Sequence, residues 1–283
     1  MPTFATPAPI SATIDLAVGD VQVIATGRSD TVVEILPRNE SNKFDVKAAA
    51  ETRIDFADGK LAIKVPKPLQ IYFTWRVGTV DVKVELPTGS HVRGTTAQGD
   101  MRCSGRLGEC QLKTYHGDIG LHHAAAVRLT TTHGQITADR VDGDAQVTGS
   151  GDIQVTEITG AARIRNLNGP TWIGEVTGDI HVNSAHGDIA IDRAGYNVVA
   201  RTAHGDVRVG DVRRGSVVIQ SASGELEVGI HAGTAAWLEV KSSSGSVRNS
   251  LEVTDRPDEP AETVQIRGRT YAGDILIRRA TTS

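Results

Sequence analysis

The feature that most constrains the fold is an internal repeat, a phrase that returns at intervals of about 18 residues. It reads "TYHGDIGL" at 114–121, "SAHGDIAI" at 184–191 and "TAHGDVRV" at 202–209. A repeat of this kind predicts an array in which each copy is one structural unit stacked on the next. The glycines that open the copies are Gly99, Gly117, Gly134, Gly151, Gly169, Gly187, Gly205, Gly224 and Gly245, with a further copy at Gly273.

Each repeat is predicted to contain two short strands. A second, weaker phrase follows the first after about half a period, as in "GDIHVN" at Gly178. Within both segments apolar residues alternate with polar ones, as at Ile189 and Ile191, and a period of two is the signature of a strand. Helical spacing is nearly absent, and the best helical candidates are "AAAETRI" and "HHAAAVRL".

Two architectures fit such strands, namely an antiparallel meander and a β-solenoid with two strands per coil. In a solenoid, equivalent positions of successive coils stack about 4.8 Å apart, so each column favours one residue type. An antiparallel meander predicts a repeat after every strand, whereas this sequence repeats after every second strand. We therefore predict an all-β, parallel β-helix-like solenoid of about 18 residues and two short strands per coil. The columns are Asp100, Asp118, Asp152, Asp188, Asp206 and Asp274 after the glycine, and His116, His133, His186 and His204 before it.

The two ends of the chain depart from the period. Residues 1–90 still read as strands, including "KFDVKAA", and are predicted to form an N-terminal all-β cap over the first coil, because open solenoid ends invite polymerisation. Residues 91–283 are predicted to form the solenoid repeats, with an acidic loop near 250–264 inserted before the last coil. We expect the aromatic cluster Tyr72, Phe73 and Trp75 to pack between cap and solenoid, the alternative being a binding patch.

Charge and hydropathy exclude some partners. The chain has 30 Lys and Arg against 34 Asp and Glu, and no basic run stands out, so no nucleic-acid partner is predicted. No stretch approaches the ~18–20 apolar residues of a membrane span, and no signal peptide is visible, so a cytoplasmic location is predicted. Cys103 and Cys110 are predicted to be reduced and buried.

The repeated phrase could bind a metal ion, because two imidazoles and two carboxylates on neighbouring coils have suitable ligand chemistry. The candidate residues are His186, Asp188, His204 and Asp206. However, the columns break at Ser150, Asn168 and Pro170, and the phrase lacks the glycines of the calcium-binding nonapeptide. We favour a structural role, in which Gly permits a corner while Asp and Thr satisfy turn amides, and expect neither a metal nor a cofactor.

Catalytic motifs are missing: the sequence contains no G-x-S-x-G, H-E-x-x-H, Walker A or G-x-G-x-x-G pattern. Some parallel β-helices cleave polysaccharides with carboxylates and basic groups gathered on one outer face. Here the outward Arg163, Arg165, Arg201 and Arg208 alternate with Asp and Thr, and no unusual cluster emerges. We therefore predict no enzymatic activity and no catalytic residues.

The repeat "SGD-aliphatic-x-aliphatic", the preceding "LPTGSHVRGTTAQGD" and the closing "TYAGDILIRRA" resemble the bacterial putative adhesin family. The resemblance covers about residues 10–280. It implies a β-solenoid with a non-catalytic role at the cell surface or envelope, and it supplies no catalytic or ligand-binding residues.

The predicted function is a non-enzymatic, adhesin-like scaffold that presents an extended polar surface to a protein or glycan partner. One alternative is a carbohydrate-active enzyme on the same scaffold. A second is a self-assembling cytoplasmic solenoid whose copies stack through their ends.

Overall fold

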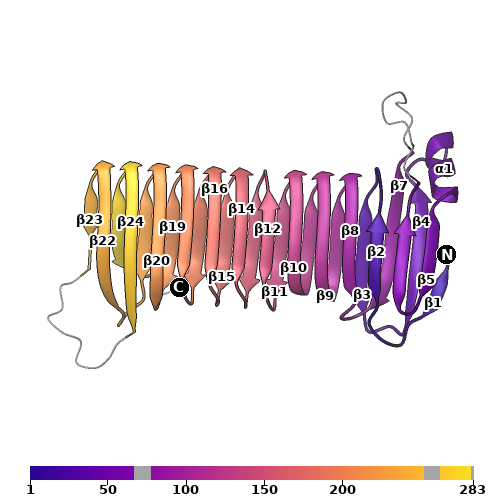
Figure 1. The fold of residues 1–283 in the computed structure, drawn as a ribbon, viewed down its shortest axis with the longest axis horizontal. Helices are drawn as coiled ribbons and strands as arrows, with labels where there is room; N and C mark the ends of the chain where they lie inside the picture. Colours follow the sequence, from indigo (N-terminus) through magenta and orange to yellow (C-terminus); the bar gives the residue numbers. More distant parts are fainter. Residues whose placement is uncertain (67–77, 252–261, 282–283) are drawn as a thin grey trace. The chain divides into compact units, whose positions relative to one another are not determined.

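The computed structural model describes residues 1–66, 78–251 and 262–281 (Figure 1). The chain is 69% strand and 3% helix, which confirms the prediction of an all-β fold. It divides into two compact units, residues 1–142 and 143–283. The aromatic cluster Tyr72, Phe73 and Trp75 lies outside the described residues, as do residues 252–261 of the predicted acidic loop.

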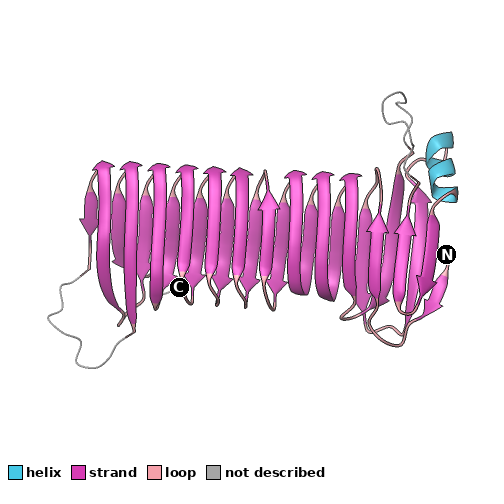
Figure 2. Ribbon diagram, viewed as in Figure 1, coloured by secondary structure: helices cyan, strands magenta, loops and turns pink. Residues whose placement is uncertain are grey.

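The second unit consists of two ladders of parallel strands (Figure 2). The first ladder contains, in spatial order, β12 (Ala145–Gly149), β14 (Ala162–Asn168), β16 (Ile180–His186), β18 (Val198–His204), β20 (Gly215–Ser223), β24 (Thr263–Ala272) and β22 (Ala235–Ser244). The second ladder contains β13 (Ile153–Ile158), β15 (Thr171–Val176), β17 (Ile189–Ala194), β19 (Val207–Val212), β21 (Leu226–Ile230), β25 (Ile275–Arg279) and β23 (Val247–Asn249).

Strands one period apart run in the same direction and share a core. Val182 pairs with Ala200 in the first ladder, and Ile191 pairs with Val209 in the second. All four side chains are buried, because alternate residues of every coil point between the ladders. The chain therefore winds forward through two strands per coil, as the solenoid prediction requires.

The last two coils of the second unit do not follow chain order. β24 lies between β20 and β22 (Figure 1), and β25 lies between β21 and β23. The coil at this end of the ladders is therefore residues 235–249, and the final repeat of the sequence is inserted one place further in. Parallel pairing permits this order because it requires only a connection long enough to cross over.

The first unit contains β1 (Thr3–Ala5), β2 (Ser11–Asp15), β3 (Val21–Thr26), β4 (Asp30–Pro37), α1 (Lys43–Ala50), β5 (Arg53–Ala57), β6 (Lys60–Lys64), β7 (Val80–Pro87), β8 (His91–Gln98), β9 (Met101–His116), β10 (Ile119–His133) and β11 (Ile136–Val141). Parallel pairing places β2 between β6 and β8, and β3 between β7 and β9. β4 pairs antiparallel with β1 and β7, and β5 pairs antiparallel with β6. These antiparallel strands are consistent with the predicted N-terminal cap. The boundary of that cap at residue 90 stays a prediction.

The segment "KFDVKAA" was expected to be a strand and is instead helix α1. The Asn42 side chain accepts a hydrogen bond from the Phe44 amide at the start of the helix. Asp45 lies in the first turn, where a carboxylate stabilises the free amides of a helix. Of the two helical candidates, "AAAETRI" is helical in its first half, where it forms the last residues of α1 before β5 begins, and "HHAAAVRL" is wrong because it lies within β10.

β9 and β10 each run through the position where a second corner was predicted. β9 carries one more residue than β10 at this point. Leu121 of β10 pairs with Cys103 of β9, but His123, two residues further on, pairs with Arg106, three residues further on. Gly105 in this interval has a φ of 81°. A bulge of this kind bends a strand without ending it, so these two coils contain one long strand where two short ones were expected.

Cys103 and Cys110 are free and buried, as predicted. Burial raises the pKa of the Cys103 thiol, and it raises that of Cys110 to about 12. Since the thiolate is the reactive species, we expect neither cysteine of the folded protein to react with a thiol reagent at pH 8, and both to react in guanidinium chloride. The exposed variant Ser243→Cys should react at once and serves as the positive control. Rapid labelling of the folded wild type would contradict the placement of both thiols.

Within the part of the chain that the structure covers, no helix has the length and apolar character to traverse a lipid bilayer.

Candidate functional site

The glycine of the repeated phrase forms a corner against the preceding coil. Gly205 has a φ of 138°, and a Cβ atom added to it would lie 2.4 Å from the carbonyl oxygen of Gly187. Gly187 is related to Gly169 in the same way, with a corresponding distance of 2.1 Å. Only glycine fits a column in which backbone contacts backbone this closely.

The aspartate that follows the glycine accepts a hydrogen bond from a backbone amide of the next coil. Asp188 Oδ1 accepts a hydrogen bond of 2.9 Å from the Asp206 amide, and Asp206 Oδ1 accepts one of 2.7 Å from the Glu225 amide. In the first unit, Asp100 Oδ1 accepts a hydrogen bond from the Asp118 amide. These carboxylates therefore act as predicted, satisfying turn amides between coils.

The histidines before the glycine are exposed and stack in pairs. The rings of His186 and His204 lie 5.2 Å apart, with an angle of 18° between their planes. The structure thus places His186, Asp188, His204 and Asp206 on neighbouring corners, as the sequence suggested. Among the described residues, no group of three or more His, Cys, Asp or Glu side chains is arranged to hold a metal ion.

The expectation of no metal stays a prediction, and calorimetry tests it. Because Asp188 and Asp206 already bind backbone amides, we expect titration with zinc to give the same small heat for the wild type and for His204→Ala. Saturable binding that the substitution abolishes would contradict the structural role of this motif.

A column of buried hydroxyl groups lines the inside of the corner. The Thr202 hydroxyl lies 3.1 Å from the His204 carbonyl oxygen and 3.3 Å from that of Gly187, and Ser221 Oγ donates to the Gly205 carbonyl. Asn166 interrupts the column: its Nδ2 donates to the carbonyl oxygens of both Gly151 and Gly169. The Ser184 hydroxyl, one coil further, is buried and has no hydrogen-bond partner among the described residues.

Because the Thr202 hydroxyl has hydrogen-bond partners and the equivalent Ser184 hydroxyl has none among the described residues, substitutions at the two positions should change stability unequally. Thr202→Val should lower the free energy of unfolding by about 1–3 kcal/mol, because it removes a hydroxyl whose proton lies between two part-buried carbonyl oxygens, those of His204 at 3.1 Å and Gly187 at 3.3 Å. Ser184→Ala removes a hydroxyl that has no partner, and should change stability by less than about 0.5 kcal/mol. Urea unfolding of the two variants measures the contrast, and equal losses would contradict the assignment.

The outward faces of the two ladders in the second unit carry different charges. On the second ladder acids and bases are paired: Arg193 lies 3.4 Å from Glu175, and Arg278 lies 2.6 Å from Glu227. The four arginines singled out in the sequence are therefore separated. Arg208 belongs to the second ladder, where it lies 3.7 Å from Glu227. The first ladder carries Arg163, Arg165 and Arg201.

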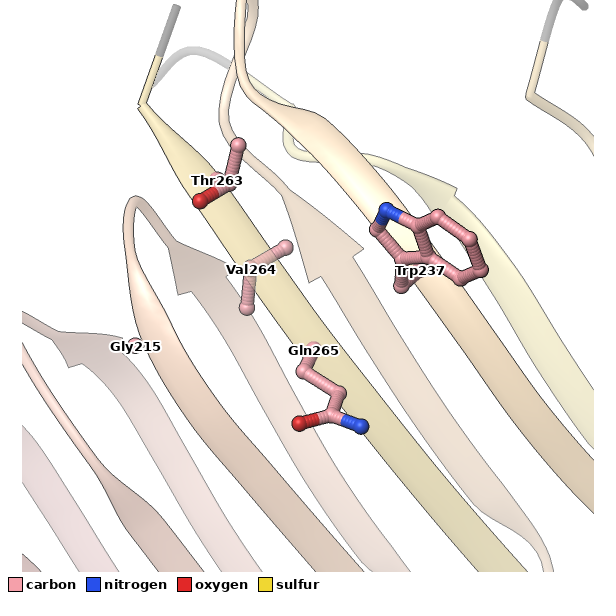
Figure 3. Close-up of a pocket in the computed structure, with 5 residues that line it drawn as sticks. All are labelled: Gly215, Trp237, Thr263, Val264 and Gln265. Atoms are coloured by element: carbon pink, nitrogen blue, oxygen red, sulfur yellow. The ribbon is translucent and has the colours of Figure 1, made fainter.

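A hollow opens on the first ladder, where β20, β24 and β22 lie side by side (Figure 3). Its volume is about 340 Å³, and it is lined by Gly215, Trp237, Thr263, Val264 and Gln265. Trp237 is 78% exposed and stands opposite Gln265 in the register. The sequence analysis did not predict this site. The alternation in "AAWLEV" could have indicated it, because it places Trp237 among the residues that point outward.

The parallel coils, with corners closed by columns of Gly, Asp and Thr or Ser, define a β-solenoid of the repeat type. The chain belongs to the Toastrack DUF4097 family, whose model matches residues 11–278. This match agrees with the expected resemblance to bacterial adhesin-like repeat proteins.

Several solved structures are similar over nearly the whole chain at low identity. One is a "Putative lipid binding protein" from Parabacteroides distasonis, with 13% identity, a TM-score of 0.43 and coverage of 98% of this chain and 95% of that one. Another is a "putative adhesin" from Bacteroides fragilis, with 11% identity, a TM-score of 0.34 and coverage of 98% and 96%. A comparison with curated protein sequences found no match.

Proposed function

We propose that this protein is a non-enzymatic, adhesin-like binding scaffold, and that the outward face of the first ladder in the second unit binds a glycan. The observation that carries the proposal is Trp237, which is 78% exposed beside the hollow. A rigid indole offers a large apolar surface at little cost in conformational entropy, and the C–H faces of sugar rings pack on such surfaces.

The chemistry around Trp237 favours a glycan over a protein partner. The neighbouring outward side chains include Gln265 and Thr263, whose amide and hydroxyl groups can both donate and accept hydrogen bonds. Protein interfaces of ordinary size have an apolar centre, whereas the outward positions here are mainly polar. Sugars, with many hydroxyl groups and few apolar faces, match this composition.

A glycan array followed by calorimetry tests the proposal. Trp237→Ala should weaken binding of the captured glycan at least about tenfold, since an exposed aromatic anchor typically contributes more than about 1.4 kcal/mol. Tyr196→Ala, which removes an aromatic side chain that is 45% exposed at a corner, is the matched control and should bind as the wild type does. Failure to bind any glycan would overturn the proposal, and release of new reducing ends would show an enzyme instead.

A second candidate function, self-assembly, is favoured by the free edge of β22. Among the strands that the structure describes, β22 pairs only with β24, and β23 only with β25. The Ala235 amide donates to the Glu262 carbonyl, so the amides of Ala236, Leu238 and Val240 face away from β24. An edge of unpaired amides and carbonyls is a template for another strand.

Two copies could pair antiparallel about a two-fold axis through Val240. Glu239 of each copy would then face Lys241 of the other, giving opposite charges across the interface. If this occurs, the wild type should sediment as a dimer. Val240→Pro, which removes an edge amide but none bonded to β24, should sediment as a monomer. A monomeric wild type at all concentrations would exclude this candidate.

A further inference from the structure

A straight row of outward side chains crosses the first ladder of the second unit, and its charged members are all cations. We call it the arginine row. The register of successive strands places its members side by side. They are Arg165 on β14, Asn183 on β16, Arg201 on β18, Gln220 on β20 and Arg269 on β24.

The cations of this face have few acidic neighbours. The strands β12, β14, β16, β18, β20 and β24 contain neither Asp nor Glu, and β22 contains one acid, Glu239. Glu239 lies 2.9 Å from Arg269 and 3.4 Å from Arg267 at one end of the row. Arg165 and Arg201 are exposed and form no ion pair with any residue that the structure describes, and the same is true of Arg163.

Two corner carboxylates next to the row are engaged by the backbone. Asp188 and Asp206, which follow the corners of β16 and β18, hold backbone amides of the next coil. On the second ladder, Arg193, Arg208 and Arg278 each form a salt bridge with a glutamate, and among the described arginines that point outward from its strands only Arg248 of β23 forms none. The first ladder instead carries three uncompensated arginines on one face, in a chain whose formal net charge is −4.

The spacing of the row suits a linear ligand. Adjacent strands lie about 4.8 Å apart, so the arginines on alternate strands repeat at about 10 Å along a straight line. Asn183 and Gln220 stand between them and supply amide donors and acceptors. A guanidinium group binds a carboxylate or sulfate through two parallel hydrogen bonds, which fixes the direction of approach.

From this geometry we infer that the arginine row binds a linear acidic glycan, a polysaccharide that carries carboxylate or sulfate groups at regular intervals. The inference rests on the proposed function and names its ligand class. A single-stranded nucleic acid fits less well, because the aromatic side chains beside the row, His181 on β16 and Tyr271 on β24, are isolated. The positions that follow the row along β16, β18 and β20 are Ala185, Ala203 and Ala222, so no continuous surface exists on which successive bases could stack.

Binding of the full chain to polyuronate tests the inference. Calorimetry at low and at high salt should show binding to the wild type that weakens steeply as salt rises, because the ligand releases counterions. The double variant Arg165→Gln/Arg201→Gln should lose at least about tenfold in affinity and show a shallower salt dependence. Its melting temperature should match the wild type, since both side chains are exposed.

Arg193→Gln/Arg208→Gln is the matched control, because it removes the same charge from the second ladder. It should lose less than about threefold. Equal losses in the two double variants would overturn the inference, since net charge alone would explain them.

The other probes separate failure of the inference from failure of the proposed function. Binding of a neutral glycan that depends on Trp237, without binding of polyuronate, would overturn the acidic ligand and leave the proposed function standing. Tighter binding of oligo-deoxythymidine or of phosphatidylserine vesicles than of polyuronate would overturn the ligand class. Absence of binding to neutral and acidic glycans alike would overturn the proposed function itself.

Discussion

The Ile189→Asp variant is expected to unfold the second unit. Ile189 is 1% exposed and sits mid-ladder, paired with Thr171 on β15 and Val207 on β19. The substitution would place a carboxylate among aliphatic side chains with no described cation in reach, and burying an unpaired charge costs several kcal/mol. Because each coil is stable only when stacked on its neighbours, a loss of more than about 4 kcal/mol at one coil should propagate.

Circular dichroism during urea or thermal unfolding would show this loss directly. Ala190→Asp is the matched control, because it adds the same group one residue along the strand, on the outward face and opposite Arg208. It should change stability by less than about 0.5 kcal/mol. An Ile189→Asp protein that melts like the wild type would show that β17 presents its other face to the core.

Gly205→Ala should produce the second large effect. The added methyl group would lie 2.4 Å from the Gly187 carbonyl oxygen, which belongs to the backbone of the preceding coil and cannot move alone. The φ of 138° is also a conformation that residues with a side chain rarely adopt. We expect a loss of about 3 kcal/mol or more, measured by denaturant unfolding.

Gly120→Ala provides the comparison for this variant. Gly120 lies within β10, and a Cβ atom there would meet its nearest neighbour, Thr137 Oγ1, at 3.6 Å, which is ordinary contact. The substitution should be neutral or slightly stabilising, because alanine has less backbone freedom to lose on folding than glycine. Similar losses at Gly120 and Gly205 would mean that the glycine column is not what closes the corner.

The winding of the chain was predictable because it depends on local rules repeated many times. Alternation within "HGDIAI" gives the strands, and identical residue types one period apart give parallel stacking. The order of the last coils was not predictable from this period. The spacing from Gly245 to Gly273 is longer than any other in the series, which signals an interruption but does not say where the final coil inserts.

The candidate site was less accessible to sequence reasoning. Arg201 and Arg208 are close in sequence, yet Arg201 lies before the corner and Arg208 after it, so they belong to different ladders. Arg269 joins the row of Arg165 and Arg201 only because β24 is inserted next to β20. A charged face of this kind arises from register between distant segments, which the local pattern does not contain.

The position of the final repeat has a consequence for biosynthesis. On the ribosome, residues 235–249 emerge before residues 263–279, at a time when β20 has no neighbour on its outer side. Val264 of β24 pairs with Gly215 of β20 on one side and with Ala236 of β22 on the other. The three strands are therefore aligned in one register, and β22 matches β20 in the same way as β24 does. A nascent chain that docks β22 on β20 first has to release it before β24 can take its native place between them.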